Sequence, residues 1–425
     1  MRAARGRKLT HIMERKKILF VAEAVTLAHL ARPLALAQML DRQRYAVHLA
    51  CAPGHEAFLT GSDAQLSLIQ SIPSAQFLAA LAAGKPVYEE ATLQAYVDED
   101  LRLLSAVRPD VVVGDFRISL SVSARLANVP YVALSNAYWS PYVRQHYTVP
   151  SLPMSKLLPI PLANALFLAV RPLAFALHTR PLNKVRLHHG LPSLGYDLRR
   201  IYTDGDRTLY ADIPEMFPAQ AMPYSHSYLG PVMWSPPMEL PEWWGAIPES
   251  RPVVYVTLGS SGQGALLPRV LAALASLPVT VIAATAGNAA PSPLPANARV
   301  ANYLPGEAAA RRASLVICNG GSPTSQQALA AGVPVLGIAG NLDQFLNMSG
   351  VVAAGAGILL RADRFDGDAV CAAAVKLIDS AEARSQAGRL GQLFRNYQPG
   401  SYLDAVLREM TGRAPEQKGG RPPLA

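Results

Sequence analysis

Short apolar runs alternate with longer segments of helical periodicity along most of this chain, and this alternation constrains the fold most strongly. Short apolar runs bounded by polar turns are typical of strands buried on both faces, as in parallel sheets. Strands separated regularly by helices form β/α units, whose helices cover both faces of the sheet. The pattern therefore predicts an α/β protein built from doubly wound, Rossmann-like sheets.

The predicted strands fall into two groups, one in each half of the chain. The first group comprises residues 16–22, 46–52, 110–115 and 131–136. The second comprises residues 252–259, 279–285, 298–304, 314–320, 333–339 and 357–362. Helical patterns lie between them at residues 30–42, 89–107, 118–127, 264–276, 324–331 and 366–379. The chain has 425 residues, half of them hydrophobic. It can bury two cores, so we expect two domains.

A stretch with six prolines, residues 230–252, separates the two groups. Proline cannot continue a helix or a central strand, so we interpret this stretch as the linker between the domains. The expected segments are a basic disordered tail at 1–14, an N-terminal domain at 15–229, the linker, a C-terminal domain at 253–395, a C-terminal helix at 396–411 and a disordered tail at 412–425.

The net charge of +9 is concentrated at the two ends of the chain. Residues 1–17 carry seven basic residues and one glutamate, and residues 412–425 carry three basic residues and one glutamate. The remaining body is about neutral, whereas tracking of nucleic-acid phosphates needs clustered charge on a folded surface. We therefore expect no nucleic-acid partner.

The first half contains a long insert at about 138–207, rich in proline, leucine and aromatic residues. We expect it to be irregular and to serve in binding, because long inserts in compact domains are often binding elements. Its most apolar run, residues 157–170, is too short for a helix that spans a bilayer and contains two prolines. The basic start lacks the apolar region of a secretory signal. We expect a cytoplasmic protein, with at most peripheral contact with a membrane.

The strongest chemical signal is the segment at residues 314–347, in which a buried strand ends in Asn319-Gly320-Gly321 and a polar loop opens a helix. Glycines let backbone N–H groups approach an anion, and a helix N-terminus adds unpaired donors and partial positive charge. This predicts a pyrophosphate cradle without a Walker lysine. Asp343 and Gln344 follow the next strand, where they can hydrogen-bond sugar hydroxyls. Ordinary loop chemistry is the alternative interpretation.

This segment resembles the donor-binding signature of the UDP-glycosyltransferase superfamily. The residues that correspond to the signature are Asn319-Gly320-Gly321-Ser322, Thr324, Gln327-Ala328-Leu329, Gly332-Val333-Pro334 and Asp343-Gln344, with an upstream match at residues 254–260. The resemblance implies a GT-B fold, in which two Rossmann-like domains face each other across a cleft. The N-terminal domain would bind the acceptor, and the C-terminal domain would bind a UDP-sugar or dTDP-sugar as co-substrate. Ser260 and Gln327 would lie near the nucleoside and its phosphates.

Three residues depart from the family pattern: Asn319 replaces a histidine, Gln327 replaces the ribose-binding glutamate, and Gly306 replaces a glutamine that helps hold the base. Gln327 can still donate and accept hydrogen bonds. The cradle depends mostly on the backbone, so we expect it to persist, whereas the identity of the nucleotide stays open.

A second similarity lies after the first predicted strand, where Ala28-His29 resembles the family's Gly-His loop. In that family this histidine is the general base that deprotonates the acceptor hydroxyl, a role that suits an imidazole because its ordinary pKa lies close to working pH. Asp115 ends the strand at 110–115 and matches the family's acidic partner, which would orient the imidazole. A histidine with a structural bond and an aspartate that caps the helix near Ser119 are the alternatives.

The acceptor side offers weaker signals. Tyr138, Trp139 and Tyr142 follow a predicted strand, and either wall an acceptor pocket by stacking or pack in the core. Leu166 and Phe167 belong to the apolar run of the insert, which is covered either by the protein's own core or by a lipophilic acceptor.

Together these features predict an inverting glycosyltransferase that needs no metal or other cofactor and moves a hexose to a hydroxyl of a small lipophilic acceptor. His29 and Asp115 would be its catalytic pair, and the cradle would stabilise the leaving diphosphate. Two alternatives remain: a nucleotide-sugar epimerase on the same fold, and a catalytically silent binding protein.

Overall fold

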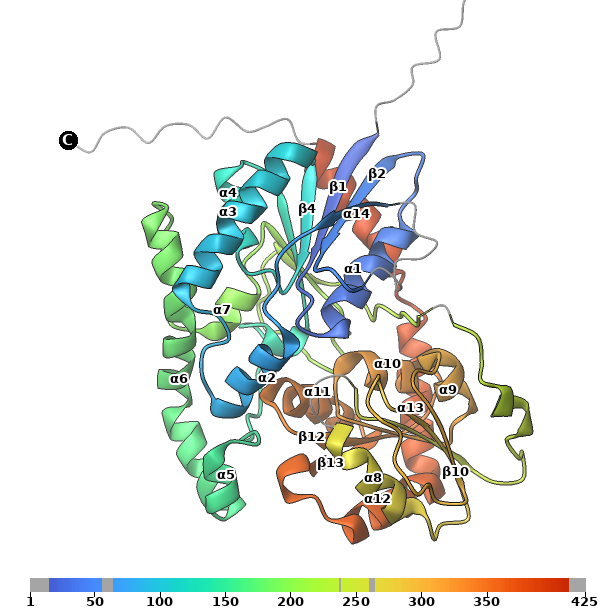
Figure 1. Cartoon of the computed structure of the whole chain (residues 1–425). Coiled ribbons are helices and arrows are strands. Elements are labelled where there is room, and N and C mark those ends of the chain that lie inside the picture. The colour runs from blue at the N-terminus through green and yellow to red at the C-terminus, as the bar shows by residue number, and fades with distance from the viewer. Residues whose placement is uncertain (1–14, 56–63, 237, 260–263, 413–425) are drawn as a thin grey trace, which may run out of the picture.

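The computed structural model describes residues 15–55, 64–236, 238–259 and 264–412, which form two α/β domains (Figure 1). The N-terminal sheet has the strand order β3-β2-β1-β4-β5-β6-β7, and the C-terminal sheet has the order β10-β9-β8-β11-β12-β13. Neighbouring strands pair in parallel throughout both sheets. The predicted fold class, two doubly wound Rossmann-like domains, is confirmed.

The first sheet comprises β1 (Lys16–Ala22), β2 (Tyr45–Cys51), β3 (Gln65–Leu68), β4 (Val111–Asp115), β5 (Tyr131–Ser135), β6 (Arg207–Tyr210) and β7 (His226–Tyr228). The second comprises β8 (Val253–Thr257), β9 (Thr280–Ala284), β10 (Ala298–Ala301), β11 (Leu315–Cys318), β12 (Val335–Ala339) and β13 (Gly357–Arg361). All ten strands predicted from apolar runs are present. The strands β3, β6 and β7 were not predicted, because each has at most four residues and contains polar ones, and β3 is in addition mostly exposed.

The helices of the N-terminal domain are α1 (Leu27–Met39), α2 (Ser74–Ala83), α3 (Glu90–Val107), α4 (Leu120–Leu126), α5 (Pro153–Leu157), α6 (Ile160–His188) and α7 (Leu198–Tyr202). Those that follow the linker are α8 (Leu267–Leu274), α9 (Gly306–Arg312), α10 (Ser322–Ala330), α11 (Leu342–Ala353), α12 (Gly367–Asp379), α13 (Ala381–Phe394) and α14 (Pro399–Gly412). The linker itself contains a short 3₁₀ helix at Glu242–Ala246.

The prediction of an irregular insert was wrong, because the insert contains the 29-residue helix α6 and the shorter helices α5 and α7. Pro161 lies in the first turn of α6, where its missing N–H would have no helical partner anyway. Pro172 and Pro181 lie inside the helix and each removes one backbone hydrogen bond, yet the helix continues through both. The apolar run at residues 157–170 is therefore part of a much longer helix than the sequence suggested.

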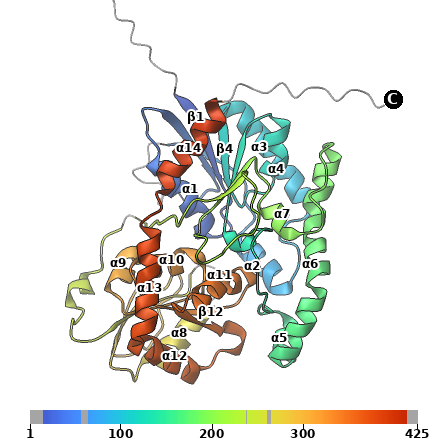
Figure 2. The ribbon, with the colours of Figure 1, turned by 180° about the vertical axis from the view of Figure 1, so that it is seen from behind.

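The last helix of the chain returns to the first domain. Helix α13 lies along the C-terminal domain, whereas α14 packs beside the N-terminal sheet (Figure 2). Leu403, Val406 and Leu407 of α14 are buried in the same core as strands β1 and β4. The two domains are thus joined twice, by the linker and by α14.

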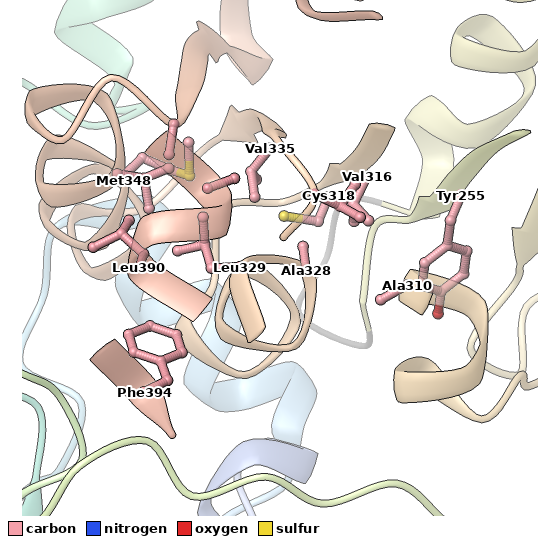
Figure 3. Packing of buried hydrophobic residues seen from close by; sticks show 14 of the residues in the cluster. Tyr255, Ala310, Val316, Cys318, Ala328, Leu329, Val335, Met348, Leu390 and Phe394 are labelled. Atoms are coloured by element: carbon pink, nitrogen blue, oxygen red, sulfur yellow. The ribbon is translucent and has the colours of Figure 1, made fainter. Parts of the chain in front are cut away.

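The C-terminal core fixes the position of the glycine-rich turn. Figure 3 shows this core, in which Val316 and Cys318 of β11 pack against Ala328 and Leu329 of α10. The turn between β11 and α10 contains Gly320, whose φ of +82° favours glycine. A Cβ atom at Gly320 would lie 2.7 Å from Cγ of Met348, so the close approach of α11 also requires glycine here.

Candidate active site between the domains

The carboxyl ends of the two sheets face each other, and side chains that follow the strands meet there. Trp139, after β5, donates from Nε1 to Oδ1 of Asp343 at 2.8 Å. Gln326 of α10 donates to Oδ1 of Asp212, which follows β6, at 3.0 Å. Because ligands of doubly wound sheets bind beyond the carboxyl ends of the strands, these contacts locate the candidate site.

His29 and Asp115 are in contact at this edge. The Nδ1 atom of His29 lies 2.8 Å from Oδ1 of Asp115. A carboxylate only accepts hydrogen bonds, so Nδ1 carries the proton and Nε2 retains a lone pair. Asp115 is buried, whereas the side chain of His29 is 20% exposed. This is the geometry that a general base requires.

Phe116 fixes the plane of the imidazole. Its ring stacks on His29 with the centroids 4.7 Å apart and an interplanar angle of 13°. Phe116 has a φ of +57°, a conformation that is uncommon for a bulky residue. The alternative in which Asp115 caps α4 is not supported, because no side chain caps that helix at Ser119.

The sequence did not reveal Arg32, which holds the other side of Asp115. Its Nε atom lies 2.7 Å from Oδ2 of Asp115, and its NH2 group donates to Oδ1 at 3.0 Å. Arg32 is buried in the first turns of α1 among apolar residues. A basic residue in such an apolar helix is the one signal that could have identified it, since buried arginines are almost always paired.

A buried polar network continues from Arg32 to the other domain. Arg32 donates to Oδ1 of Asn136 at 2.8 Å, and Asn136 donates to Oδ2 of Asp212 at 3.0 Å. Asp212 then accepts from Gln326 of α10. Burial raises the pKa of Asp212 to about 6, although hydrogen bonds from the backbone N–H of Ala137 and from Asn136, and the charge of Arg32, oppose the shift. The catalytic candidates are therefore connected to the donor-loop helix.

The predicted cradle has two donors fewer than the sequence suggested. The backbone N–H of Gly320 donates to Sγ of Cys318 at 3.3 Å, and that of Gly321 donates to Oδ1 of Asn319 at 3.0 Å, so both groups are engaged inside the turn. The carbonyl of Gly320 accepts from Asn347 at 2.7 Å, which fixes the turn from the other side. Ser322 begins α10 and Thr324 lies in its first turn. The N-cap residue of α10 is Gly321, which has no side chain to cap the first turn.

Asp343 and Gln344 have different roles in the structure. Oε1 of Gln344 accepts from the backbone N–H groups of Gly340 and Asn341, and Gln344 forms a capping box with Asn341 at the start of α11. Its carbonyl oxygen is therefore engaged within the protein, while the role of Gln344 toward sugar hydroxyls stays a prediction. Asp343, in the first turn of α11, accepts a hydrogen bond from Trp139 of the other domain.

Gly306 and Gln327, two of the residues that depart from the family pattern, lie side by side in the structure. Nε2 of Gln327 donates to the carbonyl of Trp234 in the linker at 2.6 Å. A Cβ atom at Gly306 would lie 2.2 Å from Oε1 of Gln327, so glycine makes room for this amide. The side chain predicted to lie near the nucleoside is thus held by the linker here. Ser260 lies outside the described residues.

Aromatic side chains gather around Phe116 on the acceptor side. Tyr202 lies 5.2 Å and Tyr88 6.2 Å from its ring centroid, and Trp139 packs edge-on against Tyr202 at 5.0 Å. A cavity of about 20 Å³ lies between α3, α6 and α7 and is lined by both tyrosines. The buried hydroxyl of Tyr88 has no hydrogen-bond partner in this structure. The sequence had not indicated Phe116, Tyr88 or Tyr202.

The other acceptor candidates do not form one pocket. Tyr138 is buried and packs against Phe217, and Tyr142 packs against His226. Phe167 is buried on the inner face of α6, whereas Leu166 is exposed on its outer face. The two interpretations of this run therefore divide between its residues: the protein's own core covers Phe167 but not Leu166, because adjacent positions of a helix point about 100° apart.

In the part of the chain that the structure describes, no group of three or more His, Cys, Asp or Glu side chains is arranged to hold a metal ion. Two facing α/β domains, with a paired histidine on one and a glycine-rich helix N-terminus on the other, define a glycosyltransferase of the GT-B fold.

Comparisons with known proteins identify the family. Residues 268–394 match the model described as erythromycin biosynthesis protein CIII-like, C-terminal domain. The chain is 53% identical over 403 residues to the PGL/p-HBAD biosynthesis rhamnosyltransferase of Mycobacterium bovis, covering 94% of this chain and 90% of the relative. A PGL/p-HBAD biosynthesis glycosyltransferase of Mycobacterium tuberculosis is 52% identical, covering 90% of each chain. The chain belongs to this glycosyltransferase family, within the UDP-glycosyltransferase superfamily.

Solved structures agree on the fold. The spinosyn forosaminyltransferase SpnP matches with a TM-score of 0.68 and 21% identity, covering 94% of this chain and all of that one. The spinosyn rhamnosyltransferase SpnG, complexed with thymidine diphosphate, matches with a TM-score of 0.66 and 22% identity, covering 92% of this chain and 99% of that one.

A further relative, 49% identical over 62% of this chain and 72% of its own length, is described as an inactive PGL/p-HBAD biosynthesis glycosyltransferase of Mycobacterium bovis.

Proposed function

We propose that this glycosyltransferase inverts the anomeric centre, uses a thymidine or uridine diphosphate sugar, and transfers the sugar to a hydroxyl of a lipophilic acceptor without a metal ion. The observation that carries the proposal is the contact between His29 and Asp115, at 2.8 Å, beside the interdomain cleft.

The chemical step uses the pair as a base and its orienter. Nε2 of His29 takes the proton from the acceptor hydroxyl as its oxygen forms a bond to the anomeric carbon. The bond from that carbon to the diphosphate oxygen breaks on the opposite face, which inverts the configuration and releases the nucleoside diphosphate. Asp115 stabilises the imidazolium that forms.

The donor assignment draws on the N-terminus of α10 and on the described neighbours. Backbone N–H groups and the partial positive charge of a helix N-terminus stabilise a leaving diphosphate without a cation. SpnG is described with thymidine diphosphate, and the relative in Mycobacterium bovis is described as a rhamnosyltransferase. These descriptions support a deoxyhexose carried on thymidine diphosphate as the first donor to test.

The acceptor assignment draws on the aromatic residues around His29. Phe116, Tyr88 and Tyr202 offer flat apolar surface beside the base, and the hydroxyl of Tyr88 offers a hydrogen bond. SpnG is also described in complex with spinosyn aglycone. An acceptor with an aromatic or aliphatic body fits such a surface better than a free sugar does.

Two alternatives are weaker. An epimerase would need further acidic side chains around the sugar, and among the described residues Asp343 is the one acid that we place there. A silent binding protein is a real alternative, because one relative is described as inactive. The paired His29 and Asp115 favour an active enzyme, since a binding protein needs neither.

The decisive experiment replaces the base. His29→Ala should lower kcat/KM by roughly 10²–10⁴, because that is the usual contribution of a positioned general base. Donor binding measured by calorimetry should not change, since His29 belongs to the other domain. Asp115→Asn should lower activity in the same direction, and His48→Ala, on β2, serves as the control. Near-normal turnover by His29→Ala would contradict the proposal.

Metal independence and inversion are tested on the wild-type enzyme. Turnover should survive excess EDTA, because the helix N-terminus replaces the cation. NMR of the product should show the anomeric configuration opposite to that of the donor. Loss of turnover that Mg²⁺ or Mn²⁺ restores, or a retained configuration, would overturn these parts of the proposal.

A further inference from the structure

The outer face of α6 exposes an apolar stripe to solvent. Leu162, Leu166, Leu173 and Leu177 are between 40% and 63% exposed. Their spacing of four, seven and four residues places them on one side of the helix. Leu157, at the end of α5, is 84% exposed and extends the stripe. A soluble protein rarely leaves a continuous apolar surface of this kind uncovered unless something binds it.

The inner face of the same helix is fixed to the protein along its length. Phe167 and Ala163 are buried against Val149, and Leu182 is buried in the core that contains Tyr88. Arg186 is buried and donates to Asp204 at 2.9 Å. By length and composition α6 could cross a membrane, with 11% of its most apolar 18-residue stretch buried. Spanning a bilayer would break these contacts, so the helix can only lie flat with its outer face exposed.

Charge around the stripe indicates what covers it. No aspartate or glutamate occurs between residues 151 and 196. Arg180 and Lys184 continue the stripe at the next positions on the same side of the helix, and both are exposed. Lys184 has one acidic contact, Glu90 at 2.9 Å, and Lys156 is exposed at the other end. An apolar face with basic residues at both ends is complementary to the surface of an anionic bilayer.

We propose that the outer face of α6 docks the protein on an anionic lipid bilayer, with the helix in the plane of the interface and its leucines among the acyl chains. Figures 1 and 2 show α6 along one side of the molecule, where nothing else covers it. At its start, α5 is tied to the C-terminal domain by the bond from Ser155 to Asp363. One docking surface therefore orients both domains against the membrane.

The same helix connects this surface to the acceptor side of the site. His178, Pro181 and Leu182 of α6 line the cavity that Tyr88 and Tyr202 also line. If the proposed lipophilic acceptor is correct, it would reach the aromatic residues around His29 directly from the bilayer. This connection rests on the proposed function, whereas docking on the bilayer does not.

Vesicle flotation of the whole chain tests the docking. Phosphatidylcholine vesicles with and without a third of phosphatidylglycerol serve as the probe, and no donor or acceptor is added. The double variant Leu166→Gln, Leu173→Gln should lower the bound fraction at least tenfold, because it removes two leucines from the interface and keeps helix-forming residues. The matched control is Leu294→Gln, Val352→Gln, which changes two exposed apolar residues of the C-terminal domain. The melting temperature of both double variants should equal that of the wild type.

Two outcomes would overturn the proposal. Equal vesicle binding by the wild type, the double variant and the control would show that α6 is not the docking surface; the basic N-terminal residues are the same in all three. A dimer that the double variant converts to a monomer, with no vesicle binding by the wild type, would identify a second copy as the occupant.

A kinetic comparison tests the connection separately. With an acceptor presented in vesicles, the double variant should raise KM at least tenfold, while KM for a short, water-soluble acceptor stays the same. An equal change in KM for both acceptors would show that α6 does not deliver the acceptor from the bilayer. It would not affect the conclusion from vesicle flotation. A wild type that is bound to vesicles but inactive would instead count against the proposed function.

Discussion

Arg32 shares Asp115 with His29. Its guanidinium contacts both oxygens of Asp115, and its NH2 atom lies 3.5 Å from Nδ1 of His29. The orientation of the imidazole therefore depends on three side chains and not on two. Arg32 is a positioning residue, since it acts through Asp115.

Two substitutions at Arg32 separate its charge from its shape. Arg32→Gln should lower kcat, because the buried carboxylate of Asp115 loses its cation and the contacts that orient it. Arg32→Lys keeps the charge and loses the forked geometry, so kcat should fall less than in Arg32→Gln. The measurement is kcat of the wild type and both variants at one pH. Wild-type kcat in both variants would remove Arg32 from this role.

Asp212 predicts a dependence of stability on pH. Burial raises its pKa from 3.8 to about 6. Between these values the folded chain keeps a proton that the unfolded chain has released, so this contribution to the free energy of unfolding falls as pH rises. The total loss is about 3 kcal/mol, from the size of the shift. Urea unfolding of the wild type and Asp212→Asn from pH 4 to 7 measures it, since the variant lacks this titration. Curves that run parallel would contradict the shift.

Among the secondary-structure elements, α9 and α10 form a pair that explains two unusual residues. Gly306 begins α9, and the space that its missing side chain leaves is filled by the amide of Gln327 from α10. The amide then reaches the linker at Trp234. Gly306 and Gln327 both depart from the family pattern, and the structure explains them together: the side chain of Gln327 occupies the space that a side chain at position 306 would fill.

A double-mutant cycle tests this pairing. Gly306→Ala should displace the amide in the wild type and cost stability, because its Cβ would lie 2.2 Å from Oε1 of Gln327. In the Gln327→Ala background the same change should stabilise by about 0.4–1 kcal/mol, since alanine restricts the unfolded chain. We expect a coupling of about 0.5–3 kcal/mol from urea unfolding of the four proteins. Additive effects would mean that the two residues do not share this space.

Elements whose signals are local could be predicted from the sequence, and those that depend on tertiary contacts could not. The strand β4 is buried throughout, so its apolar run was clear. Asp115 at the end of β4 pairs in register with Ala22 at the end of β1. His29 follows β1 closely in the chain, and this is why the sequence could predict its contact with Asp115. Helix α6 was missed because its prolines oppose helix formation locally, while packing of its inner face stabilises it. Arg32, Asp212 and Gln326 meet across the fold, and no spacing in the sequence relates them.

In the whole molecule, the N-terminal core is completed by the last helix of the chain. Leu403 and Leu407 of α14 are fully buried against strands of the first sheet. Asp404 accepts from Arg44 and from the hydroxyl of Tyr45, and Glu409 pairs with Arg207 at 2.7 Å. The first domain therefore cannot complete its core until the C-terminal domain has been made. Direct contacts between the domains, such as that from Trp139 to Asp343, add to these two connections.

Leu403→Ala tests whether α14 stabilises the N-terminal domain in particular. The substitution leaves a cavity in that core and should cost about 2–5 kcal/mol. Hydrogen exchange should rise in β1, β2 and β4, while β8 and β11 keep their protection, because the C-terminal core contains no residue of α14. Tyr402→Ala, at a 38% exposed position on the same helix, is the control and should change neither the stability nor the hydrogen exchange of either sheet. An equal rise in both sheets would show that the domains unfold as one unit, with α14 as part of a single cooperative structure.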